Sequence, residues 1–381
     1  MNLKRYLASA PVFRAAAISL LIAALAACSG TPRPKPVPLA PSVAVLGVKQ
    51  AWSFKIPAVE FPLSINVTGD QVAVAASDGT VVGFDARAGK ELWRASAGAP
   101  LAAGVGSDGS LVAVVTKNSE LVAIENGKVL WKQRLTAQTY TPPLVAGRRI
   151  FVQAADRTTS AWDGQSGRRL WAQQRQAEAL VLKKPGVLMA VGDTLVTGVG
   201  GRLVGINPAN GSSRWEVPIA APRGTNDVER LVDLTGAVSR VGDNICARAY
   251  FANVGCVDAA RGQLVWTKAA VGADGLGGDP SLVYGTEDNG TVIAWRRSDG
   301  EKAWSQADFL KNHVLTAPLA VGRALVIGDE TGMLHVLSSV DGKPLNRLTP
   351  DGSPITVTPV FAGNTVVVVT RNGSVFGYRP E

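Results

Sequence analysis

The chain has 381 residues, of which 39 are Lys or Arg, 30 are Asp or Glu, 41 are Gly and nine are Trp. A hydrophobic fraction of 46% excludes an intrinsically disordered protein. A charged fraction of 18% argues against long solvated helices and coiled coils. Three Cys and two His are too few for a disulfide-rich scaffold or a multi-histidine metal centre.

The N-terminal segment has the pattern of a bacterial lipoprotein signal. Basic residues precede an apolar run over residues 15–24, which is shorter than the roughly 20 residues that span a bilayer as a helix. The tetrapeptide LAAC, ending at Cys28, follows at once and resembles the lipobox, in which the Cys is lipidated. We therefore expect residues 1–27 to be removed and Cys28 to carry the lipid, with an ordinary signal peptide as the alternative. The same resemblance implies the outer membrane over the inner one, because Ser29 and not Asp follows the Cys.

Loss of this signal changes the charge of the mature protein. The signal carries three basic residues (Lys4, Arg5 and Arg14) and no acidic one, so its removal lowers the net charge from +9 to +6. Because no run of five or more Lys or Arg occurs, nucleic acid is not expected as a partner. The stretch TPRPKPVPLAP at residues 31–41 favours an extended, semi-rigid spacer. We assign residues 28–50 to the lipidated N-terminus and tether.

Residues 51–381 contain one motif written eight times. Each copy has a turn, a short strand, a second turn and then a Trp. The copies occupy residues 78–93, 118–131, 157–171, 200–215, 253–266, 289–304, 331–345 and 372–381. The seventh copy lacks the Trp, and the eighth stops after its strand because the chain ends. The missing Trp-bearing strand is found at the other end of the region, in Ala51-Trp52-Ser53.

This arrangement predicts a closed ring. The Trp residues recur about every 40 residues, which is the size of a four-stranded propeller blade. Each copy is preceded by a further alternating strand, such as QVAVAAS at residues 71–77. We expect an all-β fold, an eight-bladed β-propeller closed by pairing of the N-terminal strand with the last blade. A regular Trp in each blade favours packing between blades over binding of a sugar or a quinone.

Two resemblances bear on function. The strand-Asp-x-x-x-Gly-x-x-x-Trp unit resembles the repeat of quinoprotein dehydrogenases, which bind pyrroloquinoline quinone. With the lipobox, the Pro-rich tether and the stretch at residues 309–343, the chain more closely resembles the BamB family, lipoproteins of the bacterial β-barrel assembly machinery.

The second resemblance implies a non-catalytic scaffold without a cofactor. Such a protein faces the periplasm, docks on the POTRA domains of BamA, and assists the assembly and insertion of outer-membrane β-barrel proteins. Unfolded outer-membrane proteins are a further candidate partner. The alternatives are a pyrroloquinoline-quinone-dependent dehydrogenase and a glycan-binding propeller.

The resemblance also implies docking residues, in segments that correspond to residues 179–183 and 228–233 here. The residues assigned to partner binding are Leu180, Leu182, Lys183, Glu229, Arg230 and Asp233. The two leucines would supply apolar anchors, and the charged residues a rim that sets register. Lys183 and Thr235 depart from the family pattern, which has Arg and a second Asp there. The alternative is that both leucines face the core and the charges are merely solvated.

Two cysteines remain once Cys28 is lipidated. Cys246 and Cys256 flank a tight hairpin turn at residues 250–253, so their side chains are nearly opposite each other. In the oxidising periplasm they form a disulfide if they are a facing pair; otherwise they are two small buried thiols. No metal site or catalytic residue is predicted, and His313 and His335 are expected to be structural.

Overall fold

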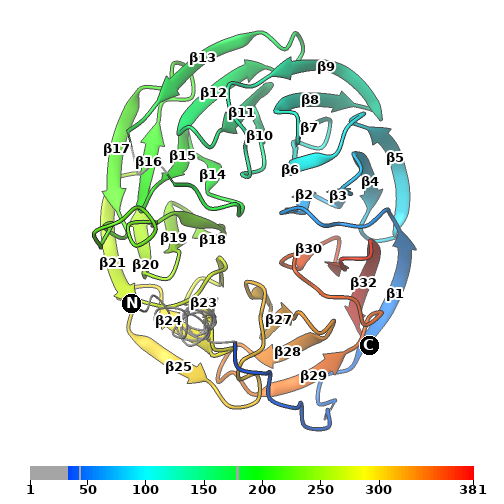
Figure 1. Ribbon diagram of the computed structural model, residues 1–381. Helices are drawn as coiled ribbons and strands as arrows, with labels where there is room; N and C mark the ends of the chain where they lie inside the picture. The colour runs from blue at the N-terminus through cyan, green and yellow to red at the C-terminus, as the bar shows by residue number, and fades with distance from the viewer. Residues whose placement is uncertain (1–32, 43, 177–179) are drawn as a thin grey trace, which may run out of the picture. The chain divides into compact units, whose positions relative to one another are not determined.

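The computed structural model describes residues 33–42, 44–176 and 180–381. Within these ranges every regular element is a β-strand, and no membrane-spanning helix is found among them. Residues 33–36 belong to a separate unit, Met1–Pro36, and carry no regular element. The unit Val37–Glu381 consists of eight four-stranded antiparallel sheets arranged as blades around a common centre (Figure 1). The predicted eight-bladed β-propeller is confirmed.

Seven blades each use four strands that are consecutive in the sequence, running from the centre outwards (Figure 1). Blades 1 to 4 comprise, four strands each, β2 (Asn66–Thr68), β3 (Gln71–Ala75), β4 (Thr80–Asp85), β5 (Lys90–Ser96), β6 (Leu101–Ser107), β7 (Leu111–Thr116), β8 (Glu120–Glu125), β9 (Lys128–Arg134), β10 (Leu144–Ala146), β11 (Arg149–Gln153), β12 (Thr158–Asp163), β13 (Arg169–Gln174), β14 (Leu188–Val191), β15 (Thr194–Val199), β16 (Arg202–Ile206) and β17 (Ser213–Pro218). Blades 5 to 7 comprise β18 (Leu234–Val241), β19 (Asn244–Ala249), β20 (Asn253–Asp258), β21 (Gln263–Ala269), β22 (Leu276–Gly278), β23 (Leu282–Thr286), β24 (Val292–Arg296), β25 (Lys302–Gln306), β26 (Leu319–Val321), β27 (Ala324–Gly328), β28 (Leu334–Ser338) and β29 (Pro344–Leu348).

The eighth blade joins the two ends of the chain. It contains β30 (Val360–Ala362), β31 (Thr365–Val369) and β32 (Ser374–Pro380), with β1 (Val48–Lys55) as its outermost strand. β1 pairs antiparallel with β32, from Val48 opposite Pro380 to Lys55 opposite Ser374. The predicted closure by the N-terminal strand is therefore confirmed. The strand begins at Val48, slightly before the expected boundary at residue 51.

Strand composition follows position within the blade. Middle strands such as β7 (LVAVVT) are buried along their whole length, because neighbouring blades cover both of their faces. Outer strands such as β9 (KVLWKQR) consist mainly of exposed residues apart from the Trp. The low charge of the chain and its many short apolar runs thus have one cause, the stacking of blades.

A tryptophan on the outermost strand contacts the next blade at seven of the eight seams of the described ring. At five of these seams the indole N–H donates a hydrogen bond to a carbonyl just after the third strand of the following blade, with N···O distances of 2.8–3.0 Å. The pairs are Trp52 with Ala86, Trp131 with Gly164, Trp171 with Pro208, Trp266 with Arg297, and Trp304 with Ser339. The prediction that the Trp residues pack between blades is confirmed.

A glycine in the same turn allows the indole to approach. A Cβ on Gly300 would lie 2.5 Å from the ring of Trp266, and the φ of +72° at Gly300 is in the left-handed region. At the seam between blades 4 and 5, Gly262 approaches Trp215 in the same way, and between blades 1 and 2 Gly127 lies against Trp93. The Asp-x-x-x-Gly-x-x-x-Trp spacing therefore encodes two contacts, one with each neighbouring blade.

In the seventh copy, the residue at the Trp position lies one residue beyond the boundary expected from the sequence. The outer strands carry a bulge before the Trp, so that Gly83 pairs with Trp93 and Leu92 is skipped. In blade 7 Val336 pairs with Asn346 and Leu345 is skipped. The residue at the Trp position is therefore Asn346, and not Leu345 as the copy boundary suggested.

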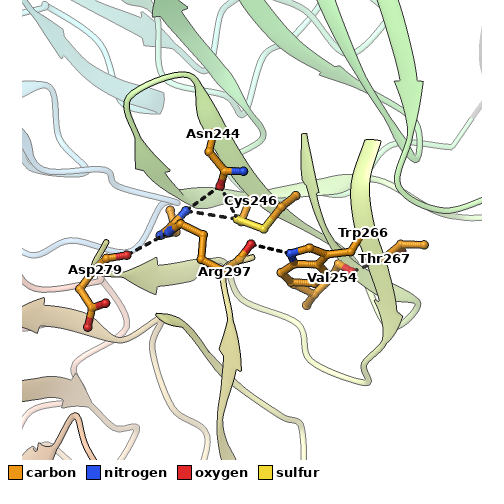
Figure 2. The surroundings of a disulfide bond; sticks show 9 residues. Asn244, Cys246, Val254, Trp266, Thr267, Asp279 and Arg297 are labelled. Carbon is orange, nitrogen blue, oxygen red and sulfur yellow. Dashed lines mark hydrogen bonds between the residues drawn. A yellow bond between two sulfur atoms is a disulfide. The ribbon is translucent and has the colours of Figure 1, made fainter. Parts of the chain in front are cut away.

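The two cysteines of blade 5 are directly opposite each other. Cys246 on β19 pairs with Cys256 on β20, the Cα atoms are 4.0 Å apart, and the structure joins the two sulfur atoms. Both residues are fully buried in a cluster with Trp266. Figure 2 shows Arg297 beside the disulfide, with its carbonyl accepting the Trp266 N–H and its guanidinium 3.3 Å from the Cys246 Sγ. The cross-link therefore lies beneath the contact between blades 5 and 6.

Truncation of an inter-blade indole should destabilise the whole ring. We expect Trp131→Ala to lower the free energy of unfolding by about 3 kcal/mol, because it removes buried apolar area and one hydrogen bond. Leu130→Ala, on the adjacent and 39% exposed residue, should change it by less than about 0.5 kcal/mol. Urea denaturation measures both variants, and equal destabilisation by the two would contradict the assigned role of the indole.

Cys246 and Cys256 should be bonded in protein isolated from an oxidising compartment. Thiol alkylation in denaturant, read by intact mass, should label neither residue before reduction and both after it. The double variant Cys246→Ala/Cys256→Ala should lose about 2–3 kcal/mol of stability, since the cross-link closes a short loop in the unfolded chain. Labelling of both thiols in unreduced protein would show that they are buried free thiols instead.

Candidate functional site

The two segments expected to bind a partner lie side by side. The first connects β13 of blade 3 to β14 of blade 4, and the second connects β17 of blade 4 to β18 of blade 5. The Leu182 N–H donates a hydrogen bond of 2.9 Å to the Asp233 Oδ2. We call the surface formed by Leu180, Leu182, Lys183, Glu229 and Arg230 the linker patch. Ala179, the first residue of the expected segment, lies outside the described residues, as does Cys28.

A buried arginine holds the two segments together. The Arg157 Nη1 lies 2.7 Å from the Asp233 Oδ1, and its Nη2 donates a 2.8 Å hydrogen bond to the Leu180 carbonyl. The side chains of Arg157 and Asp233 are only 9% and 10% exposed. Loss of either partner would leave a buried charge uncompensated, which costs about 3–5 kcal/mol. The ion pair therefore fixes the position of one linker relative to the other.

Asp233 is not part of the charged rim that the sequence predicted. Its carboxylate is buried and is occupied by Arg157 and by the Leu182 N–H. The physical reason is that Arg157 reaches it from the turn between β11 and β12, directly beneath the linkers. Asp233 instead positions the first linker, through its bonds to the Leu182 N–H and to Arg157.

The remaining predicted residues are distributed over the surface. Leu180 is 39% exposed, and Lys183, Glu229 and Arg230 are also exposed, whereas Leu182 is half-buried. Leu180 therefore does not face the core, contrary to the alternative considered from the sequence. The Glu229 Oε2 accepts hydrogen bonds from the Thr225 N–H (2.8 Å) and Oγ1 (3.3 Å), and these bonds lower the pKa of the Glu229 carboxyl. The Glu229 carboxylate thus stays ionised, and its hydrogen bonds to Thr225 hold together the exposed part of the second linker.

Sequence reasoning missed Arg157 because its role depends on another repeat. Its φ of +67° is in the left-handed region, at a turn position where blades 1, 6 and 8 have Gly79, Gly290 and Gly373. A non-glycine residue in this position is unusual and points to a constraint from elsewhere. The presence of Arg at a turn position that is Gly in other repeats was the feature of the sequence that could have indicated this role.

An exposed aromatic residue lies next to the linker patch and was also missed. The Tyr250 N–H donates to the Asp233 carbonyl (2.9 Å), which places the β19–β20 turn against the second linker. Phe251, the next residue, is 43% exposed with a φ of +48°, and the Tyr250 ring packs edge-on against it at 4.6 Å. A bulky aromatic thus occupies a left-handed backbone position at the surface, which non-glycine residues rarely adopt.

The centre of the ring contains a cavity of about 890 Å³, and Lys183 and Lys184 of the first linker are among the residues that line it. The carboxylate residues among those that line it are Glu60 and Asp274, and Asp274 Oδ1 lies 2.7 Å from the Lys184 Nζ. In the described part of the chain, no group of three or more His, Cys, Asp or Glu is placed to hold a metal ion. The lining also includes Arg240, several Ser, Thr and Asn residues, and many apolar residues of the innermost strands and the loops before them.

Comparisons with known proteins give one consistent family. The family model described as "Outer membrane protein assembly factor BamB" matches residues 77–306. The chain is 38% identical to outer membrane protein assembly factor BamB of Burkholderia pseudomallei (strain K96243), with 100% of both chains covered. It is 34% identical to the protein of that name from Bordetella pertussis (strain Tohama I), covering 96% of this chain and 97% of the relative.

A solved structure supports the fold independently. The crystal structure of BamB from Moraxella catarrhalis superimposes with a TM-score of 0.79, covering 87% of this chain and 99% of that one, at 23% sequence identity. The repeat architecture, the closure of the ring and the full-length sequence matches all agree. The chain belongs to the BamB family of outer membrane protein assembly factors.

Proposed function

We propose that this protein is a non-catalytic scaffold lipoprotein, anchored through Cys28 in the outer membrane and facing the periplasm. It docks on the POTRA domains of BamA and assists the assembly and insertion of outer-membrane β-barrel proteins. The family supports the assembly role, and the lipobox resemblance supports the anchor.

The observation that carries the docking proposal is the linker patch on its buried ion pair. Arg157 and Asp233 hold the two linkers together at Leu180, Leu182 and Asp233, so this part of the patch is positioned before a partner arrives. A preorganised surface loses less conformational entropy on binding. Loops on a rigid scaffold are also where binding residues concentrate.

The chemistry of the patch suits a protein partner. Leu180 on the first linker and Phe251 on the turn beside the second linker are exposed apolar side chains. Lys183, Glu229 and Arg230, on the same two linkers, are exposed charges of both signs. An apolar centre within a charged rim is the usual organisation of a specific protein interface, and aromatic residues are frequent at its energetic centre.

The linker patch should bind POTRA domains in a purified system. We expect Leu180→Asp to weaken binding about tenfold or more, because a carboxylate replaces an apolar anchor. Phe251→Gly should also weaken binding while preserving the fold, since Phe251 has a φ of +48°, which glycine adopts without strain. Leu92→Asp, at a 47% exposed leucine on the outer strand of blade 1, serves as the matched control.

Surface plasmon resonance with immobilised POTRA domains measures these affinities, and circular dichroism checks the folding of each variant. Full binding by both Leu180→Asp and Phe251→Gly would overturn the assigned surface. No binding by the wild-type protein would overturn the docking function itself.

Cys28 should carry the membrane anchor. In cells, Cys28→Ser should move the protein from the membrane fraction to the soluble periplasmic fraction, because stable anchoring requires acyl chains buried in the bilayer. Mass spectrometry of the N-terminal peptide of the wild-type protein should show an acylated Cys28. A mature N-terminus without a lipid would contradict the anchor.

A further inference from the structure

The seam between blades 7 and 8 lacks the contact found at the other seams. The residue at the Trp position of blade 7 is Asn346. The turn that should receive an indole is missing as well, because the third and fourth strands of blade 8, β32 and β1, come from opposite ends of the chain. Both halves of the usual contact are therefore absent where the ring closes.

The chain before β1 occupies this place. The Asn346 Nδ2 donates a 2.7 Å hydrogen bond to the Leu46 carbonyl, as the indoles at other seams donate to the carbonyl of a turn. The Leu345 carbonyl accepts hydrogen bonds from the Val45 N–H (2.8 Å) and the Leu46 N–H (3.2 Å). The Glu381 N–H donates to the Gly47 carbonyl at 3.2 Å. These bonds join the incoming chain to blade 7 and to the C-terminus.

Contacts continue along blade 7 towards the start of this segment. The Arg347 Nη2 donates a 2.6 Å hydrogen bond to the Ala40 carbonyl. Leu39 packs against the apolar cluster that includes Tyr284 and Leu310. The Val37 N–H donates to the Lys311 carbonyl at 3.0 Å. In Figure 1 the dark blue segment passes β29 before it enters β1.

A buried histidine holds the far end of the segment. The His313 Nε2 lies 2.9 Å from the Val37 carbonyl, and its Nδ1 lies 3.2 Å from the Asp329 Oδ2, which is also 2.8 Å from the His335 Nε2. Burial raises the pKa of Asp329, but hydrogen bonds from His335, Met333 and Thr331 hold it below the ordinary value. The ionised Asp329 thus orients His313 towards Val37, and both histidines have the structural role that the sequence indicated.

The segment suits such a site chemically. Three carbonyls, those of residues 37, 40 and 46, each accept a bond from a side chain of blade 7 or of the linker before it. Pro38 and Pro41 have no N–H that would need a partner, and proline favours the extended form. An extended chain recognised through its backbone with one apolar anchor is a common mode of peptide binding.

We propose that blade 7 and the linker before it carry a peptide-binding site whose ligand is the protein's own chain at residues 37–42 and 44–46, and that this stretch serves as the eighth inter-blade contact of the ring. Val43, within the segment, lies outside the described residues. The site makes part of the expected tether a component of the folded propeller. The proposal does not depend on docking to BamA.

Hydrogen exchange on the full mature protein tests the site directly. The amides of Val45 and Leu46 should exchange at least about tenfold more slowly than in a free peptide of the same sequence, as expected for a hydrogen bond with a net free energy of about 1.4 kcal/mol. Asn346→Ala and Leu39→Asp should each raise the exchange of both amides severalfold. Leu92→Asp should leave it unchanged.

Asn346→Leu provides the second arm, because it keeps the size of the side chain while removing its donor. It should also speed exchange at Val45 and Leu46 and lower the melting temperature. Random-coil exchange at Val45 and Leu46 in the wild-type protein would overturn the proposal. Unchanged protection in Asn346→Ala and Asn346→Leu would equally overturn the assigned contact.

Discussion

The packing of a Trp from one blade into the turn of the next is the interaction on which this molecule depends. A four-stranded sheet of three- to eight-residue strands has little core of its own. The ring becomes stable because each blade buries both faces against its neighbours, and the indole of the outer strand fixes the spacing between them. The glycine that admits the indole sits four residues before the next Trp, so the same short motif recurs around the ring and supplies the contact at seven of the eight seams.

Rigidity of the ring explains why a surface made from separate linkers can be specific. The linkers after blades 3 and 4 belong to different repeats and have irregular backbones, yet Arg157 and Asp233 hold them in contact. This ion pair is buried, so it contributes mainly by defining one arrangement of the linkers. The exposed residues above it, Leu180 and Phe251 among them, are then presented together. A partner that docks on these linkers, as we propose, would meet side chains that are already positioned.

The fold could be predicted from the sequence because the relevant signal is periodic. The repeat length, the Trp spacing and the truncated last copy together specify the number of blades and the closure by β1. The facing register of Cys246 and Cys256 also followed from their symmetric spacing about a turn. Local patterns of this kind can be recognised in a single sequence, because they recur in each repeat.

What the sequence did not predict depends on contacts between distant repeats. Asp233 looks like a surface charge until Arg157 is placed beneath it. The segment before β1 looks like a free tether, and only the missing turn of blade 8 reveals why it is retained on blade 7. Phe251 looks like an ordinary turn residue until its turn is found against the second linker, where the Tyr250 N–H bonds to the Asp233 carbonyl. In each case the informative feature is a departure from the repeat, whose meaning requires the partner in space.

Site-specific photo-crosslinking in living cells tests the central claim most directly. A photoreactive residue at position 180, in the linker patch, should crosslink to BamA, whereas the same residue at position 92, on the outer strand of blade 1, should not. That result would place the rigid linker patch at the interface of the assembly machinery. Absence of a BamA crosslink from position 180, or equal crosslinking from both positions, would contradict the account.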